Sequence, residues 1–212
     1  EGWKKHNWRI QLDEKMQQLK HYFQLPEWKN KSESRILILT EQGVGDKIMF
    51  AAFLSLLPEN RQYTVVVSTR LVAIFKRSFP TLHIVEGTQE NIFTLKQQPF
   101  DAYCFMGCLP KILHVPTPNG LTFLTSAPYI CKRYSENLRV GISWRGGIGI
   151  ERKKRSIDLL SWLPILKTPN IHFVNLQYDA QQAEIATMQS HNITIESDAS
   201  INALNDMDAF AS

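Results

Sequence analysis

Short, continuously apolar runs alternate along most of this chain with stretches whose apolar residues recur at helical spacing. The clearest example begins at 36–39, which is wholly apolar, and continues after a glycine turn into a predicted helix over 47–57. A run without polar positions is typical of a strand covered by helices on both faces. Repeated alternation of such strands with helices predicts a wound parallel α/β sheet.

The alternation continues to the end of the chain. Strands are predicted at 63–68, 82–85, 100–106, 138–144, 171–176 and 193–195, and helices at 71–79, 157–166 and 180–189. Prolines become frequent between 109 and 134, which indicates a crossing between two lobes. We therefore predict an N-terminal Rossmann-like lobe over 34–134 and the start of a second over 135–212.

The N-terminal segment, 1–33, is predicted to be a helix and a linker. Apolar residues fall on one face of a helix over 1–25, which Pro26 ends, and 27–34 is polar. The residues of that face are Trp8, Leu12, Met16, Leu19 and Phe23. A lone amphipathic helix needs a partner, and two remain open: the lobe that follows, or an upstream helical array of which this is the last helix.

Composition narrows the classes of protein without selecting one. With 212 residues and 43% hydrophobic content, the chain can bury a full core. Its net charge of +4 is mild and its cations are spread out, so we expect no nucleic-acid partner. Cys104, Cys108 and Cys131 have neither zinc nor disulfide spacing, which suits a reducing compartment. No signal peptide or apolar run of spanning length is present, so we expect a cytoplasmic protein.

The first glycine turn, Gly43-Val-Gly-Asp46, is the first place to look for a function. It follows a predicted strand and opens a helix, where backbone N–H groups point outward and ligands bind in open α/β sheets. A dinucleotide fingerprint would need a third glycine at Ile48, so NAD and FAD are disfavoured. Asp46 has two interpretations, an N-cap or a carboxylate that takes a proton from a hydroxyl, and spacing alone favours the cap.

A basic loop follows the first strand of the second lobe. Its glycines and cations precede a predicted helix start, and such a combination suits a diphosphate, although a solvated loop is an equally good interpretation. The cations are Arg145, Arg152, Lys153, Lys154 and Arg155.

Two weaker candidates complete the set. Gln177 ends a strand and could either reach a ligand or cap the strand. Asp206 and Asp208 form a D-x-D pattern that some transferases use for a metal, but the pattern arises easily by chance. The histidines show no ligand spacing, so we expect no metal site.

Four motifs together resemble a known family. They are Glu41–Phe50 (EQGVGDKIMF), Arg139–Trp144 (RVGISW), Arg155–Ile157 (RSI) and Phe173–Gln177 (FVNLQ). In order and spacing they are similar to the glycosyltransferase-like domain that follows tetratricopeptide repeats (TPR) in many bacterial proteins. That domain resembles the family 9 heptosyltransferases, which have the two-lobed GT-B fold. Gly2-Trp3 and Trp8-Arg9 look like the junction after the last repeat, which favours the upstream array.

The resemblance implies inverting, metal-independent transfer of a sugar from a nucleotide-diphosphate sugar to a hydroxyl of a glycan or protein, without a cofactor. Asp46 stands where the family has its proposed base. Lys154, with Arg155 beside it, best matches a lysine that contacts the donor phosphates, and Gly43, Gly45, Arg145 and Gln177 complete the expected binding set. The family's His-containing donor motif would lie beyond Ser212, so we expect a fragment with an incomplete second lobe, inactive by itself.

Two other classes of function compete with transfer. One is a non-catalytic GT-B-like module that binds a glycan or a protein, and the other is a nucleotide-binding regulatory domain. The acidic residue and the basic loop favour the enzyme, because a pure scaffold would need neither.

Overall fold

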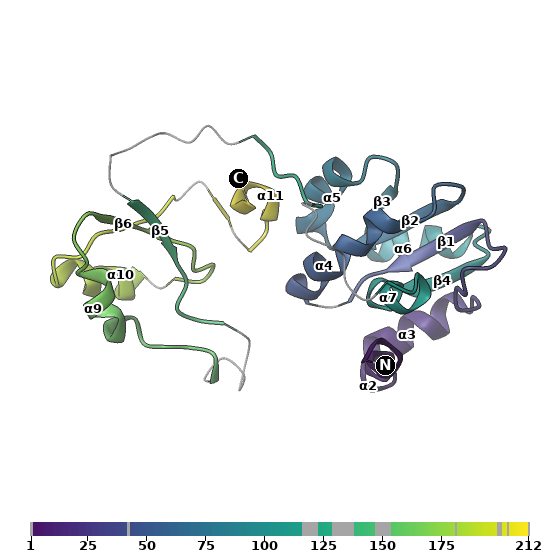
Figure 1. Ribbon diagram of the computed structural model, residues 1–212, viewed down its shortest axis with the longest axis horizontal. Coiled ribbons are helices and arrows are strands. Elements are labelled where there is room, and N and C mark those ends of the chain that lie inside the picture. The colour runs from purple at the N-terminus through teal and green to yellow at the C-terminus, as the bar shows by residue number, and fades with distance from the viewer. Residues whose placement is uncertain are drawn as a thin grey trace. The chain divides into compact units, whose positions relative to one another are not determined.

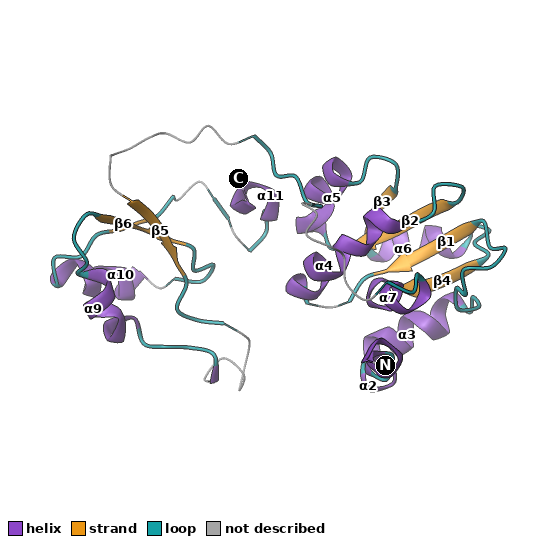
Figure 2. Ribbon diagram, in the orientation of Figure 1, coloured by secondary structure: helices purple, strands orange, loops and turns teal. Residues whose placement is uncertain are grey.

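The computed structural model describes residues 2–41, 43–115, 123–128, 138–146, 154–180, 182–198, 201–202 and 204–211. The chain forms two compact units, Glu1–Ala127 with Ala211–Ser212, and Pro128–Phe210, and each is described by itself. Each unit contains a parallel sheet with helices, four strands in the first and three in the second (Figure 2). The predicted α/β class with two parallel sheets is therefore confirmed.

The sheet of the first unit has the order β3-β2-β1-β4, and all of its strand pairs are parallel (Figure 1). Its strands are β1 (Arg35–Leu39), β2 (Gln62–Val67), β3 (His83–Glu86) and β4 (Ala102–Phe105). The predicted strands all lie within two residues of these bounds, and the predicted 100–106 strand begins two residues later, after the bend at Asp101.

Helices connect these strands in the way that parallel pairing requires. They are α4 (Val44–Ala51) with the 3-10 helix η1 (Ala52–Leu56), η2 (Thr69–Leu71) with α5 (Val72–Ser78), and α6 (Gln89–Lys96). The helices η3 (Met106–Cys108) and α7 (Leu109–Ile112) follow β4, the last strand of this sheet along the chain. The sequence pattern did not predict α6, because this helix is largely polar and only Leu95 is fully buried in it. Its start is fixed by Thr88, whose side chain accepts a hydrogen bond from Asn91 N.

Both faces of this sheet are covered. Leu37 and Leu39 of β1 share a core cluster with Phe23 of the N-terminal segment and Leu95 of α6. Neighbouring side chains of a strand point to opposite faces, so the buried Ile38 faces the other side, where α4 and α5 supply buried phenylalanines. Cover on both faces explains why the strand sequence is continuously apolar.

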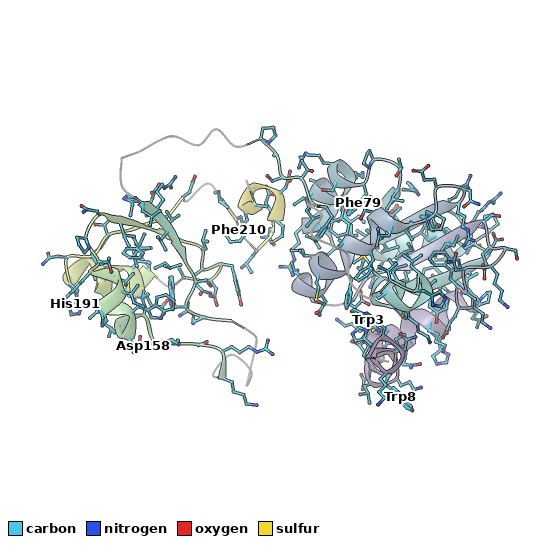
Figure 3. The ribbon with its side chains drawn as sticks, viewed as in Figure 1. Trp3, Trp8, Phe79, Asp158, His191 and Phe210 are labelled. Carbon is cyan, nitrogen blue, oxygen red and sulfur yellow. The ribbon has the colours of Figure 1, made fainter. Side chains whose placement is uncertain are left out.

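The N-terminal segment is three helices and not the single predicted one. These are α1 (Gly2–His6), α2 (Arg9–Leu12) and α3 (Glu14–Phe23). The break lies at Asp13, whose carboxylate accepts from Met16 N at 3.0 Å and so begins a new helix. As a result the predicted apolar face is wrong at Trp8, which is labelled in Figure 3, and at Leu12. These two residues are 65% and 85% exposed, whereas Met16 and Phe23 are buried as predicted.

The predicted polar linker also takes part in the fold. Trp28 N donates to Tyr103 O at 2.7 Å, and Tyr103 N donates to Pro26 O at 3.0 Å, so residues 26–28 pair with the outer edge of β4. Trp28 itself is 2% exposed. The N-terminal segment therefore belongs to the first unit and supplies part of its core.

The second unit has the strand order β5-β6-β7, again all parallel. Its elements are β5 (Leu138–Ile142), the 3-10 helix η4 (Leu159–Trp162), α9 (Leu163–Leu166), β6 (Ile171–Asn175), α10 (Gln182–Ser190), β7 (Ile195–Glu196) and α11 (Met207–Ala211). Trp144, Phe173 and Met188 lie in its core. The predicted helix over 157–166 is a 3-10 turn followed by one α-helical turn, because Asp158 caps its start and Pro164 stands at its second α-helical position.

Candidate functional site

The strand order of the first unit reverses beside β1. Strands β1, β2 and β3 follow one another in one direction, whereas β4 lies on the other side of β1. In open α/β sheets, ligands bind at such a switch point, outside the carboxyl ends of the strands. The segments concerned are Thr40–Asp46 after β1 and Met106–Cys108 after β4.

A buried carboxylate ties these two strand ends together. Glu41, 6% exposed, accepts hydrogen bonds at Oε1 from Gly107 N at 2.8 Å and from Arg9 Nη2 at 2.7 Å. A Cβ at Gly107 would come within 2.6 Å of both Arg9 Nη2 and Glu41 Oε1, so the ion pair requires glycine there. Glu41 thus joins β1, β4 and the N-terminal helix α2.

Arg9 is held from several sides. His6 Nδ1 lies 2.9 Å from Arg9 Nη1, and Cys108 Sγ lies 3.6 Å from Arg9 Nη2. The guanidinium carbon lies 5.9 Å from the centre of the Phe50 ring of α4. Burial, and then the positive charge of Arg9, lower the pKa of His6, so the neutral imidazole is favoured. Burial raises the pKa of the Cys108 thiol, which is therefore a poor nucleophile.

Asp46 does not occupy the N-cap position that the sequence suggested. Helix α4 begins at Val44 with Gly43 as its N-cap, so Asp46 is the third helical residue. Its carboxylate folds back over Gly43, where an added Cβ would lie 2.5 Å from Asp46 Oδ2. Gly43 is therefore needed for this close approach, whereas Gly45 has open space around it. Asp46 remains exposed to solvent beside first-turn N–H groups, which have no intrahelical acceptor.

The next residue, Lys47, is a buried cation, 8% exposed. Burial lowers its pKa, the nearby charge of Arg70 adds to this effect, and the charge of Glu41 opposes it. We call Arg9, Glu41, Asp46 and Lys47 the switch-point cluster. It places two carboxylates and two cations around one strand end, with Asp46 as its exposed carboxylate.

Gln177 organises the corresponding strand ends in the second unit. Its Oε1 accepts from Ser143 Oγ at 3.1 Å, Trp144 N at 3.1 Å and Arg145 N at 2.8 Å. Its Nε2 donates to Asp179 Oδ1 at 2.6 Å, and the residue is 5% exposed. The side-chain amide of Gln177 thus clamps the turn after β5 to the end of β6. These contacts match the strand-capping interpretation of Gln177.

Arg145 is paired inside the same unit. Its guanidinium forms ion pairs with Glu184 and with Asp179 Oδ1, the latter at 3.4 Å, and Nη2 donates to Asp179 O at 2.7 Å. The side chain is 15% exposed. Two carboxylates therefore offset its charge, and Arg145 is suited to shaping the loop more than to attracting an anion.

The described end of the basic loop returns to β5. Ile157 N donates to Trp144 O at 2.9 Å, and a Cβ at Gly146 would lie 3.7 Å from Arg155 O. Lys154 and Arg155 are exposed beside this strand end, as an anion site there would require. Arg152 and Lys153 lie outside the described residues.

Replacing Gln177 by leucine should loosen the turn at Ser143–Arg145. Two backbone N–H groups and a hydroxyl would lose their shared acceptor, and an unsatisfied buried donor costs about 1 to 3 kcal/mol. We expect hydrogen exchange at Trp144 and Arg145 to accelerate by about tenfold or more. Ser143→Ala, which removes one donor and leaves the acceptor, is the matched control. Unchanged exchange in Gln177→Leu would contradict the clamp.

The candidate residues thus fall into two groups. Gly43, Gly45 and Asp46 lie together in the first unit, and Arg145, Lys154, Arg155 and Gln177 lie around one strand end of the second. That both groups face one cleft between lobes stays a prediction. The D-x-D pattern has a local role, because Asp206 Oδ1 accepts from Asp208 N and Ala209 N at the start of α11.

Sequence reasoning missed Arg9, Glu41 and Lys47. The available signal was Glu41 itself, an acidic residue two positions after a continuously buried strand, where a charge must find a partner. Within the described residues there is no cluster of three or more His, Cys, Asp or Glu side chains suited to a metal ion. In the same part of the chain, every helix is too short or too polar to cross a membrane.

Comparison with known proteins gives one informative relationship. No family model matches the chain, and no solved structure gives a significant match. The chain is similar to the protein FlbA of Caulobacter vibrioides, with 30% identity over 194 residues. The match covers 77% of this chain but only 32% of FlbA, so the chain spans about a third of the length of that relative.

Proposed function

We propose that this chain is part of a glycosyltransferase-like protein of the GT-B type that transfers a sugar from a nucleotide-diphosphate sugar to a hydroxyl. In this proposal the first unit is the acceptor lobe, the second is the start of the donor lobe, and the N-terminal helices follow TPR repeats. The observation that carries the proposal is the position of Asp46, an exposed carboxylate beside the switch point of a parallel sheet.

The chemistry needs a base and a site for the leaving group. Asp46 would take the acceptor's proton as the new bond to the sugar forms. The nucleoside diphosphate would leave with increasing negative charge, which Lys154, Arg155 and nearby backbone N–H groups would stabilise more in the transition state than in the ground state. In this scheme Arg145 and Gln177 act indirectly, by holding the turn that presents the loop.

A binding module is the second candidate, and the pairing of Arg145 favours it. A cation already offset by Asp179 and Glu184 adds little to the attraction of a diphosphate. Such a module would keep the two-unit fold and bind a glycan or a protein without turnover.

Titration with UDP, GDP and ADP separates these candidates. If the loop is a diphosphate site, the 212-residue chain should bind with weak affinity that falls steeply with salt, because exposed charges are screened over about 8 Å at physiological ionic strength. Lys154→Ala with Arg155→Ala should remove most of this binding. Lys76→Ala with Lys167→Ala, which removes two exposed cations elsewhere, is the matched control.

The outcomes are distinct. Nucleotide binding that persists in the Lys154→Ala, Arg155→Ala variant would show that the anion site lies outside this loop. Absence of any nucleotide binding in the full-length protein, combined with glycan binding, would favour the binding module. Sugar transfer by the 212 residues alone would show that they already contain a complete donor pocket.

A further inference from the structure

The first unit contains a second concavity that the proposed reaction does not use. It has a volume of about 500 Å³, within the range of small-molecule pockets. Its walls come from the N-terminal helices, from the outer edge of β4 with the paired segment 26–28, and from α7 and the residues that follow it. Neither the Gly43–Asp46 turn nor Lys47 lines it. We call it the β4 cavity.

The inner wall of the β4 cavity is apolar and aromatic. Trp28, Tyr103 and Phe105 are at most 2% exposed and line it together with the thiol of Cys108. Trp3 (Figure 3) contributes from α1. Its ring lies edge-on to that of Phe50 of α4, with 6.3 Å between the ring centres. Rigid aromatic rings around a cavity favour an apolar body of matching size.

The polar part of the lining is positively charged. Lys29 and Lys111 line the cavity and are exposed, so they lie at its mouth. The acidic residue of the lining, Glu27, is already paired with Lys20 at 3.2 Å. Among the described residues neither Lys29 nor Lys111 has an ion-pair partner. In the described part of the chain, no ion pair therefore offsets the charges of these two lysines at the mouth.

The lining also has unused hydrogen-bonding capacity. Asn7 Oδ1 and Trp28 Nε1 are buried without a partner among the described residues. Buried polar atoms are nearly always paired in native proteins, so two in one wall call for an explanation. The indole N–H of Trp28 is a donor from which a carboxylate oxygen can accept, whereas Asn7 Oδ1 is an acceptor that a carboxylate cannot satisfy.

We propose that the β4 cavity binds a small amphipathic carboxylate, with its apolar body between Trp3, Trp28 and Phe105 and its carboxylate between Lys29 and Lys111. This goes beyond the proposed sugar transfer and does not depend on it. The apolar body gains free energy by leaving water, and the charged mouth selects an anion over a neutral or cationic molecule of the same length.

Three ligands with eight chain carbons test the proposal: octanoate, octanol and octyltrimethylammonium. The two ions are used below their micelle concentrations and octanol below its solubility limit. Binding to the 212-residue chain is followed by tryptophan fluorescence and by calorimetry. We expect octanoate to bind at least threefold more tightly than octanol, and octyltrimethylammonium most weakly. Equal or tighter binding of the cation, or no binding of octanoate, would overturn the proposal.

Variants locate the site. Lys29→Ala with Lys111→Ala should weaken octanoate about three- to tenfold, the size expected for two exposed ion pairs, and leave octanol within about twofold. Lys76→Ala is the matched control. Ile112→Trp, which fills the cavity, should abolish binding of both ligands. If Ile112→Trp does not fold, Val115→Phe is used as the filling variant in its place. Octanoate binding that neither filling variant affects would show that octanoate binds outside the β4 cavity. Binding of the protein to anionic vesicles without binding of free octanoate would identify a membrane-surface patch instead.

Discussion

In the full-length protein, Asp46→Asn should lower sugar turnover at least a hundredfold while donor affinity changes little. A general base acts in the transition state and contributes roughly a hundred- to ten-thousand-fold, or about 3 to 5 kcal/mol of barrier. Asparagine has nearly the same shape but cannot accept the proton. As a third helical residue, Asp46 otherwise contributes only about 0.3 to 1 kcal/mol to stability through the helix dipole.

The measurement is release of nucleoside diphosphate at saturating donor, with donor affinity determined separately. Glu14→Gln is the matched control, because it neutralises an exposed first-turn carboxylate of another helix, α3. A fall in turnover that is specific to Asp46 supports its role as the base. Normal turnover in Asp46→Asn would reduce Asp46 to a residue that stabilises the start of α4.

Arg9→Met should destabilise the first unit by about 3 kcal/mol. It leaves Glu41, 6% exposed, without its cationic partner, and breaking a buried ion pair costs about 3 to 5 kcal/mol. We expect the lower end of this range, because Lys47 lies close enough for its charge to be felt by Glu41. The cost should appear as faster hydrogen exchange in β1 and β4, whose ends Glu41 joins.

A second substitution separates charge from packing. Glu41→Gln in the Arg9→Met background removes the uncompensated charge and keeps an acceptor for Gly107 N, so at least half of the lost stability should return. Lys5→Ala, which removes an exposed cation from α1, should have little effect. If the losses from Arg9→Met and Glu41→Gln simply add, the two residues are not energetically coupled and the ion pair is incidental.

The parallel sheets could be predicted from the sequence because their strands have an unmistakable signature. Residues 36–39 have no polar position, and only a strand with helices on both faces satisfies that pattern. The start of α4 was placed too late, because Asp46 is a better N-cap by residue type than Gly43. In the structure Gly43 takes the cap position, and an added Cβ there would lie 2.5 Å from Asp46 Oδ2, so a larger residue would displace the Asp46 carboxylate.

The N-terminal segment shows where periodicity fails. A 3.6-residue pattern runs from Trp8 to Phe23, yet it crosses Asp13, whose side chain satisfies a backbone N–H best at a helix start. The resulting break rotates the first part of the pattern, so Trp8 and Leu12 face solvent. A local hydrogen bond therefore overrode a periodic pattern of apolar residues.

The switch-point cluster could be anticipated only in part. Arg9 and Glu41 are 32 positions apart, and nothing local to either residue specifies the other. Their pairing follows from the way α2 packs beside the carboxyl ends of β1 and β4, which is a tertiary property. Gln177 differs, because its place at a strand end already suggested two roles, contact with a ligand or capping of the strand. Its hydrogen bonds to Ser143, Trp144 and Arg145 match the capping role.

The pairing of residues 26–28 with β4 bears on how the protein avoids self-association. In the order β3-β2-β1-β4, β4 is an outer strand, and an unprotected outer strand offers a row of backbone groups to any other chain. Here the backbone N–H of Tyr103 donates to Pro26 O, and its carbonyl accepts from Trp28 N, so neither group is left for another chain. A chain cut at the predicted boundary between 33 and 34 would uncover this edge together with the apolar surface beneath α3, and it would be prone to aggregate through β4 even with its sheet intact.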